Sequence, residues 1–330
     1  MIDFNQQGLT SEYVNLHNST NESAWQNIRI PIYCLNGKPG PTTLVLGGVH
    51  GDEYEGPIAI ENIITSIDLD KLNGRLILLP ATNVTAVMSG TRLTPEDGLN
   101  LNRVFPGNAN GSLTQRIANI ITQDLIPLAD HVIDLHSGGK TLNFAPCVFI
   151  YENTGENFQT TLNAATAFGA HFTVFIEDDF SEVMIDDVVK KAGKVMIASE
   201  LGGAGMLTRD SASLATNGLK RCLSALGHIK SITTPPETKF ARLSEHSEHI
   251  ICDDTCVFEP SVNLGDLLSK GDIIGYQHRL DRIDEPPKPI ISKTTGALLC
   301  LCGQALVKRG DVIAIVVEIF DSEKLQKSGI

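Results

Sequence analysis

Residues 42–64 constrain the fold of this chain more than any other stretch. They begin with a β-branched and apolar run, TTLVL, which is typical of a buried strand. Two glycines end the run, His50 and Glu53 follow, and isoleucines then recur at mostly helical spacing beyond Pro57, which the first turn of a helix tolerates. The stretch therefore predicts a strand, a loop and a helix. Because ligands of open α/β sheets bind at the carboxyl ends of strands, this loop is a candidate binding site.

The same order of features recurs twice further along the chain. The apolar run HVIDL is followed by His136, the run KVMIAS is followed by Glu200, and a glycine pair comes shortly after each. Side chains alternate along a strand, so Asp134 and His136 would share one face and His131 would lie on the other. Asp134 is then either a support for the His136 imidazole or a solvated strand residue.

The order of the remaining patterns indicates an α/β sheet with helices on both faces. A leading strand or hairpin is expected within residues 1–40. The segment 83–112 is rich in Gly, Pro, Asn and Asp and too long for a passive connection, so a functional loop is expected there. Further strands are predicted at 75–80, 131–135, 144–151, 172–176 and 194–199, and helices at 113–128, 157–168, 181–192 and just before Gly227.

The composition changes at residues 231–240, where two prolines and several hydroxyl side chains indicate a linker. We therefore expect an α/β domain at 1–235 and a β-rich domain at 236–330. Within the second, LLSKGDIIG and LVKRGDVIA look alike and predict two related hairpins packed in a barrel or sandwich. This part resembles the lipoyl/biotinyl type of β fold, but it has no Met-Lys-Met or Asp-Lys-Ala motif, so no covalent cofactor is expected.

Composition and charge argue against several classes of protein. No apolar run is long enough to span a membrane, and the amino terminus lacks the features of a signal peptide. A net charge of −13 disfavours nucleic acid as a partner, because such binding depends on neutralising phosphates. Seven cysteines, an odd number, favour reduced thiols and a cytoplasmic location. Cys252, Cys256, Cys300 and Cys302 could form a structural zinc site, but small apolar filling of the β-rich part is the favoured interpretation.

His50, Glu53 and His136 together offer two imidazoles and a carboxylate. This is the ligand set of catalytic zinc sites that leave the fourth position to water. A His-x-x-Glu pair alone is usually part of a polar surface. Here the pair follows a buried strand and two glycines, and a second strand end supplies the third ligand, so the residues predict a metal site.

Four motifs make the chain recognisable: GGVHGDE, NLNRVFPG, DLHSGG and SELGG, in this order. Together they resemble the succinylglutamate desuccinylase/aspartoacylase family, relatives of the zinc carboxypeptidases, over most of residues 40–205. Within that family, the GTRL, NRVFPG and DLHSGGK stretches are most similar to a bacterial subgroup that deacetylates N-acetyl-diaminobutyrate during ectoine breakdown.

The resemblance implies a zinc-carboxypeptidase-like mixed sheet flanked by helices and one zinc ion per subunit. It implies an amidohydrolase that removes an acyl group, in the subgroup an acetyl group, from the α-nitrogen of an amino acid. His50, Glu53 and His136 match the zinc ligands, and Glu200 matches the catalytic glutamate. The remaining matched positions are Asn102 and Arg103, which imply binding of the substrate carboxylate, and Arg92, which implies a role at the carbonyl oxygen.

Alternatives stay open at this point. A carboxypeptidase-type peptide hydrolase would use the same zinc chemistry with a more open cleft, and a non-catalytic metal- or metabolite-binding protein is a third hypothesis. The acidic residues Glu177, Asp178 and Asp179 would either attract a cationic substrate side chain or form a solvated turn, which is favoured. The expected partners are a small N-acyl amino acid and further copies of this chain in a homo-oligomer, with neither nucleic acid nor membrane.

Overall fold

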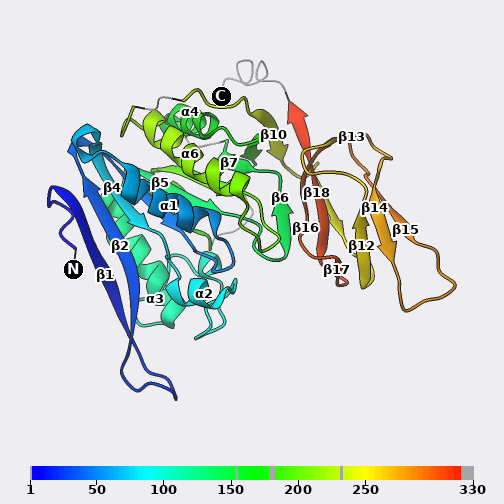
Figure 1. Cartoon of the computed structure of the whole chain (residues 1–330), viewed down its shortest axis with the longest axis horizontal. Helices are drawn as coiled ribbons and strands as arrows, with labels where there is room; N and C mark the ends of the chain where they lie inside the picture. Colours follow the sequence, from blue (N-terminus) through cyan, green and yellow to red (C-terminus); the bar gives the residue numbers. More distant parts are fainter. Residues whose placement is uncertain (1, 153–154, 178–182, 231–232, 321–330) are drawn as a thin grey trace.

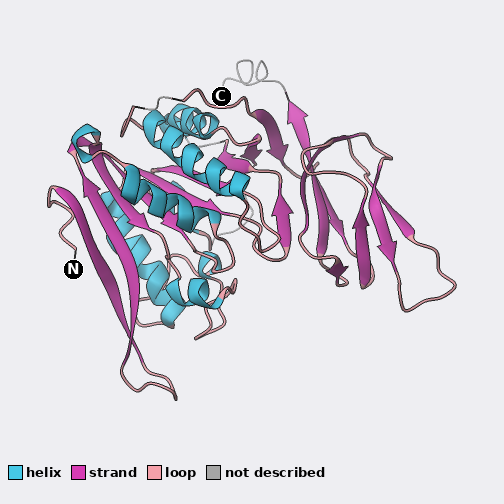
Figure 2. Ribbon diagram, in the orientation of Figure 1, coloured by secondary structure: helices cyan, strands magenta, loops and turns pink. Residues whose placement is uncertain are grey.

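A mixed β-sheet with helices against both faces makes up the earlier, larger part of the chain, and strands alone make up most of the part beyond β10 (Lys239–Leu243) (Figures 1 and 2). This computed structural model describes residues 2–152, 155–177, 183–230 and 233–320. The β1–β2 hairpin lies at one end of the molecule, and the strand-only part lies at the other (Figure 1).

Four parallel strands at the centre of the sheet position the candidate site. β4, β3, β5 and β9 lie side by side in this order, and their side chains are mostly buried. Burial on both faces explains why each of them contains a nearly continuous apolar run. Because the strands are parallel, their carboxyl ends meet at one edge of the sheet. Their bounds are Lys38–Gly47 for β3, Asn73–Leu79 for β4, His131–His136 for β5 and Val195–Glu200 for β9.

Helices pack against both faces of this sheet, as predicted. α1, α4 and α6 share one buried apolar cluster with the strands, and α3 and α5 share another on the opposite face. The helices are α1 Glu55–Ser66, α2 Val84–Ser89, α3 Leu113–Ile120, α4 Phe158–Phe168, α5 Ile185–Lys191 and α6 Arg209–Ala225.

The leading hairpin is confirmed as β1 (Gly8–Asn18) paired with β2 (Gln26–Asn36). The single strand expected at 144–151 is wrong. The structure has β6 (Leu142–Phe144) and β7 (Cys147–Tyr151) instead, separated at Pro146, which has no N–H to donate to a strand ladder. β7 continues the sheet between β9 and β8 (Phe172–Ile176), whereas β6 pairs with a strand of the C-terminal part.

Two further expectations need correction. The helix predicted at 113–128 is regular only in α3, and it continues as a π-helical turn and then a 3₁₀ turn that contains Pro127. The functional loop expected at 83–112 is not all irregular, because it contains α2 and a 3₁₀ turn at Leu101–Arg103. The helix expected at 181–192 is α5, and its first two predicted residues lie outside the described part of the chain.

The C-terminal strands form two layers packed on a common apolar core. One layer contains β11, β18, β16 and β13 and continues the large sheet through β10, and the other is a separate sheet of β15, β14, β12 and β17. Their bounds are β11 Glu248–Ile251, β12 Cys256–Pro260, β13 Leu267–Leu268, β14 Ile273–His278, β15 Lys288–Ile291, β16 Gly296–Cys302, β17 Leu306–Val307 and β18 Val312–Phe320.

The internal repeat folds as two equivalent turns, one between β13 and β14 and the other between β17 and β18. Gly271 and Gly310 occupy matching positions with φ of 103° and 93°, which side chains other than glycine rarely adopt. In each turn the following aspartate accepts a hydrogen bond from a backbone N–H, at 2.8 Å for Asp272 and 2.9 Å for Asp311. The repeat therefore reflects a local structure that the chain uses twice.

The two parts of the chain are joined by strand pairing as well as by the polypeptide. β10 pairs with β8 of the first sheet and with β18, and β6 pairs with β16. The division into domains at 1–235 and 236–330 stays a prediction. Among the described helices, none combines the length and apolar character that crossing a bilayer requires.

Candidate active site

The loop between β3 and α1 brings His50 and Glu53 to the carboxyl edge of the sheet. Gly51 lies between them, and its N–H donates to the Thr91 carbonyl at 2.9 Å. A Cβ at this position would lie 1.9 Å from the backbone of Ala86 in α2. Only glycine therefore allows the loop and α2 to pack this closely, which explains the glycine between two site residues.

His50, Glu53 and His136 converge on one point, although His136 lies 83 residues beyond Glu53. The two carboxylate oxygens of Glu53 lie 2.7 Å from His50 Nδ1 and 2.8 Å from His136 Nδ1. All three side chains are buried. Within the described residues, this is the group of His, Cys, Asp and Glu side chains whose spacing suits a metal ion.

The Nε2 atom of each of the two histidines lies within hydrogen-bond distance of a side-chain oxygen outside the ligand set. His136 Nε2 lies 2.8 Å from Asp134 Oδ2, and His50 Nε2 lies 3.1 Å from Asn100 Oδ1. An oxygen acceptor at Nε2 fixes the ring orientation and leaves Nδ1 as the coordinating atom, an arrangement that metal-binding histidines commonly show. Of the two readings of Asp134, support for the His136 imidazole is therefore the correct one.

The charges of the site favour a cation. Burial alone would raise the pKa of Glu53, but His50 and His136 together lower it below its usual value. Burial would likewise lower the pKa of His136, yet the carboxylates of Asp134 and Glu53 raise it well above its usual value. The carboxylates of Asp134 and Glu53 thus make the surroundings of the His136 imidazole negative. The donor set fits a divalent metal ion such as zinc.

Glu200 ends β9 directly beside the ligand strand, since it pairs with His136 in the β5–β9 ladder. Its Oε2 atom is buried and has no hydrogen-bond partner among the described residues. Burial, followed by the negative charge of Glu53, raises the pKa of Glu200 to about 8. A cation at the neighbouring ligands would oppose this rise. Glu200 therefore has a free carboxylate oxygen next to the candidate metal centre.

The three other predicted residues lie in or near the NLNR segment. Arg92 Nη1 lies 3.3 Å from Glu53 Oε1, so this loop arginine reaches the ligand carboxylate. Arg103 is exposed like Arg92, and partial burial of its side chain, followed by the charge of Arg92, lowers its pKa. Asn102 is buried and its Oδ1 accepts a hydrogen bond from the Ile185 N–H at 3.0 Å. Its Nδ2 keeps no partner within the described residues and remains a free donor.

Two residues with roles around the ligands were missed from the sequence. Asn100, which holds His50, lies two positions before Asn102 in the quoted motif, and its amide could have been suspected from that place. Asp52 lies between the two ligands of the first loop and is buried. Its carboxylate accepts the Lys140 N–H at 2.9 Å, which ties the His50 loop to the glycine loop after β5.

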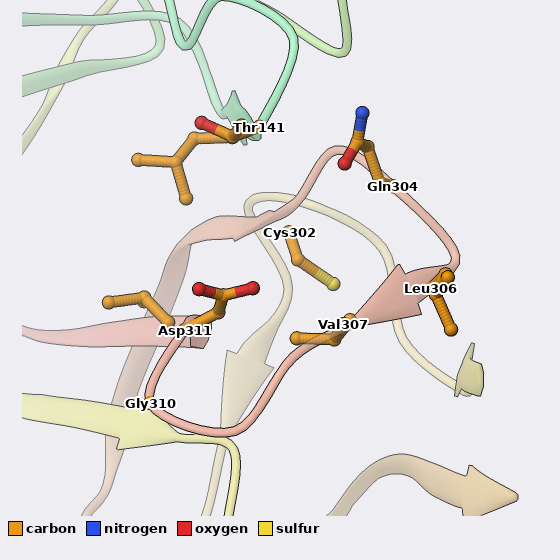
Figure 3. Close-up of a pocket in the computed structure, with 9 residues that line it drawn as sticks. Thr141, Cys302, Gln304, Leu306, Val307, Gly310 and Asp311 are labelled. Atoms are coloured by element: carbon orange, nitrogen blue, oxygen red, sulfur yellow. The ribbon is translucent and has the colours of Figure 1, made fainter. Parts of the chain in front are cut away.

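A cavity of about 360 Å³ lies where that glycine loop meets the C-terminal strands (Figure 3). Thr141 lines it from the first part of the chain, and Cys302 and Val307 line it from the second. The Gly303 N–H donates to the Thr141 carbonyl at 2.8 Å. The C-terminal part therefore touches the segment that begins five residues after His136.

The cysteines of the C-terminal part pack as apolar residues. Cys252 and Cys256 lie in its buried core with their sulfur atoms 3.7 Å apart. Burial, followed by the neighbouring Cys252 thiol, raises the pKa of Cys256 to about 12. The geometry agrees with the favoured interpretation of these cysteines as small core residues.

The acidic cluster after β8 is only partly described. The Glu177 carboxylate lies 3.9 Å from Arg242 Nε of β10, while Asp178 and Asp179 lie outside the described residues. Glu177 thus makes an ion pair with a neighbouring strand.

Comparisons with known proteins agree on one family. The model of the succinylglutamate desuccinylase/aspartoacylase catalytic domain matches residues 39–226. The N-alpha-acetyl-L-2,4-diaminobutyric acid deacetylase of Halomonas elongata is 33% identical over 97% of this chain and 95% of its own length. The product-bound ectoine utilization protein EutE (DoeB) of Ruegeria pomeroyi is 33% identical with a TM-score of 0.92, covering 96% of this chain and 97% of that one. A succinylglutamate desuccinylase from Silicibacter has 32% identity, a TM-score of 0.91 and 97% coverage of both chains.

Proposed function

The chain belongs to the succinylglutamate desuccinylase/aspartoacylase family, and from this premise we propose that it is a zinc-dependent deacetylase of N-acetyl amino acids. The related deacetylase and desuccinylase support the coarser statement that it is an acyl-removing hydrolase. The named substrate of the Halomonas relative makes N-acetyl-L-2,4-diaminobutyrate the substrate that we propose here. The single observation that carries the proposal is the convergence of His50, Glu53 and His136 beside the free carboxylate oxygen of Glu200.

His50, Glu53 and His136 would hold the metal ion. When bound, zinc supplies a Lewis acid that polarises a carbonyl oxygen and brings the pKa of water to ~7. Asp134 and Asn100 keep the two imidazoles in the orientation that this requires.

Glu200 would move the proton. Its Oε2 takes a proton from the attacking water and returns it to the leaving α-nitrogen, so that one carboxylate acts as base and then as acid. Its place at the end of β9, beside His136 but outside the ligand set, supports this role.

Arg92, Asn102 and Arg103 would bind the substrate. The Arg92 guanidinium, already at the ligand carboxylate, would stabilise the negative charge that develops on the carbonyl oxygen. Arg103, with the free Nδ2 donor of Asn102, would pair with the α-carboxylate, since a guanidinium binds a carboxylate through two parallel hydrogen bonds. In a protein with a net charge of −13, such a local cation is needed to capture an anionic group.

Assembly and location are part of the same proposal. The cysteines of the described residues are all free thiols, which supports a reducing, cytoplasmic compartment. The homo-oligomer stays a prediction.

A substrate screen tests the proposed function. The zinc-loaded protein is assayed against N-acetyl, N-succinyl and N-formyl amino acids with acidic, basic and neutral side chains, and against short peptides. The expected result is hydrolysis of N-acetyl amino acids, fastest with N-acetyl-L-2,4-diaminobutyrate. Faster cleavage of peptides would establish a carboxypeptidase instead, and zinc binding without any hydrolysis would establish a binding protein.

The proposed carboxylate site has its own test in Arg103→Lys, which keeps the charge but loses the planar geometry. We expect kcat/KM for the free acid to fall roughly 10-fold or more, while the corresponding amide, a poor substrate from the start, is barely affected. If the unaltered enzyme hydrolyses N-acetyl amino amides as fast as the free acids, Arg103 does not bind a carboxylate and a general amidase is the better description.

A further inference from the structure

Asp186, in the first turn of α5, is a buried carboxylate without an evident purpose in the fold. Only 6% of its surface is exposed. Its carboxylate makes no hydrogen bond to another side chain and no ion pair among the described residues. Burying an ionised carboxylate is costly unless it is paired, so proteins rarely keep such a group without a function. This residue plays no part in the mechanism proposed above.

The position of Asp186 places it at the substrate-binding segment. The N–H of its neighbour Ile185 donates to Asn102 Oδ1 at 3.0 Å, so the start of α5 is fixed against that segment. After burial, the charge of Asp134 raises the pKa of Asp186, which reaches about 6. The charge of Asp186 in turn acts on Arg103, where it opposes the lowering of the arginine pKa. Asp186 thus lies within electrostatic range of both the metal centre and the proposed carboxylate site.

A buried carboxylate at this position can bind the one group of the substrate that the other residues leave without a partner. Arg103 would hold the α-carboxylate and the metal centre would hold the acyl carbonyl, which leaves the amino acid side chain as the group still without a partner. A buried anion is complementary to a cation. An acidic side chain would instead be repelled by both Asp134 and Asp186.

Resting on the function proposed above, we propose that Asp186 is a specificity-determining residue that pairs with a cationic side chain of the N-acyl amino acid. The chemical class is an N-acyl diamino acid whose second amine is free and protonated. A substrate with a neutral side chain would leave the Asp186 carboxylate buried and unpaired. The enzyme would discriminate against this substrate because the ion pair is missing.

A matched pair of substrates tests the inference. N-acetyl-L-2,4-diaminobutyrate and N-acetyl-L-2-aminobutyrate have the same carbon chain and differ in the terminal ammonium. We expect the unaltered enzyme to favour the first by roughly 10²-fold in kcat/KM, the value of a hydrogen bond between charged groups. Asp186→Asn should abolish this preference by lowering kcat/KM for the diamino substrate roughly 10²-fold, mainly through KM, with the neutral substrate changed less than about threefold.

The neighbouring acid provides the control. Asp187 belongs to the same helical turn, where its Oδ2 accepts the Met184 N–H at 3.2 Å. Asp187→Asn should leave the ratio between the two substrates unchanged, although it perturbs the same helix end. Binding of the products by calorimetry adds a readout that does not depend on turnover. Diaminobutyrate should lose affinity for Asp186→Asn, and 2-aminobutyrate should not.

Two outcomes would overturn the inference alone. An equal loss on both substrates would show that Asp186 positions Arg103, and an unchanged preference would show that the ammonium is bound elsewhere. An unaltered enzyme that hydrolyses neither substrate nor any other N-acyl amino acid would instead overturn the proposed function, and this inference with it.

Discussion

The two ends of β5 each hold a pair of histidines, and the group that joins the pair differs. At the carboxyl end, His136 and His50 are joined by the Glu53 carboxylate, at 2.8 and 2.7 Å. At the amino end, His131 and His228 are joined by the Thr43 hydroxyl, whose oxygen lies 3.0 and 2.6 Å from their ring nitrogens. Three of these four histidines are buried, and His131 is partly buried, so burial alone does not separate the two pairs.

The joining group decides what each pair can do. His228 Nδ1 donates to the Asn73 carbonyl at 2.8 Å. Burial lowers the pKa of His228 to about 4, so the ring is neutral at pH 7 and its Nε2 accepts from the Thr43 hydroxyl. At the other end, carboxylates raise the pKa of His136. The comparison shows that a carboxylate between two imidazoles makes a cation site, whereas a hydroxyl makes a neutral hydrogen-bonded network.

Replacing one histidine at each end should produce the largest contrast. His136→Ala should remove most of the bound zinc and lower kcat/KM roughly 10³-fold or more, since the metal supplies several kcal/mol of transition-state stabilisation. His131→Ala, in the same strand, should keep both zinc and activity. Metal analysis of the purified variants and hydrolysis of N-acetyl-L-2,4-diaminobutyrate are the measurements. Full activity of His136→Ala would refute the ligand assignment.

Acid should lower the stability of the folded protein through His228, one of the two histidines at the amino end of β5. His228 stays neutral in the folded protein down to about pH 4, whereas in the unfolded chain it binds a proton near its ordinary value of 6.5. Unfolding therefore takes up a proton between these values, and the free energy of unfolding falls as the pH drops from 6.5 to 4. This contribution is present above pH 6.5 and amounts to about 3 kcal/mol.

Urea unfolding at a series of pH values measures this effect, with His228→Gln as the matched variant. The groups that face His228 are His131, whose charge lowers its pKa further, and Asp130, whose charge opposes this. They remain in the variant, so the difference between the two proteins isolates His228. Identical slopes of stability against pH for both proteins would count against the neutral network.

Glu200 tests whether the carboxyl end contains chemistry beyond metal binding. Glu200→Gln removes the proton acceptor but keeps the shape, so we expect zinc content to be unchanged and kcat to fall roughly 10²-fold. Loss of zinc from this variant would make Glu200 a ligand and overturn the proposed mechanism. Both quantities are measured on the same preparation.

The supporting residues should show the smallest effects. Asp134→Asn weakens the acceptor behind His136, so zinc affinity should fall roughly 10-fold, as for outer partners of metal ligands generally. Thr43→Val removes the hydroxyl at the other end and should cost about 1–3 kcal/mol of stability without any change in zinc affinity. Competition with a chromophoric chelator measures the first, and denaturant unfolding measures the second. If both variants lost zinc affinity to the same degree, the histidine pair at the amino end of β5 could not be called a purely structural network.

Several parts of the structure could not be predicted from local patterns. The strand expected at 144–151 is two strands because Pro146 interrupts the ladder, and β6 then pairs with β16 far along the chain. From the sequence, Asp134 was either a support for the His136 imidazole or a solvated strand residue, because its partner depends on the orientation of the His136 ring. Asp186 had no motif, since its environment is created by α5 packing against residues more than 80 positions earlier.

By itself the sequence determined the alternation of strands and helices, the C-terminal strands with their repeat, and the candidate ligands His50, Glu53 and His136. It could do so because an apolar run followed by glycines places the next polar residue at a strand's carboxyl end, and parallel strands bring these ends to one edge. Only the tertiary structure decided the partners of each histidine. Thr43 and His228 lie 185 residues apart, and hydrogen bonds depend on distances of a few ångströms that no local pattern specifies. The same residue type therefore became a candidate metal ligand at one end of β5 and a neutral structural group at the other.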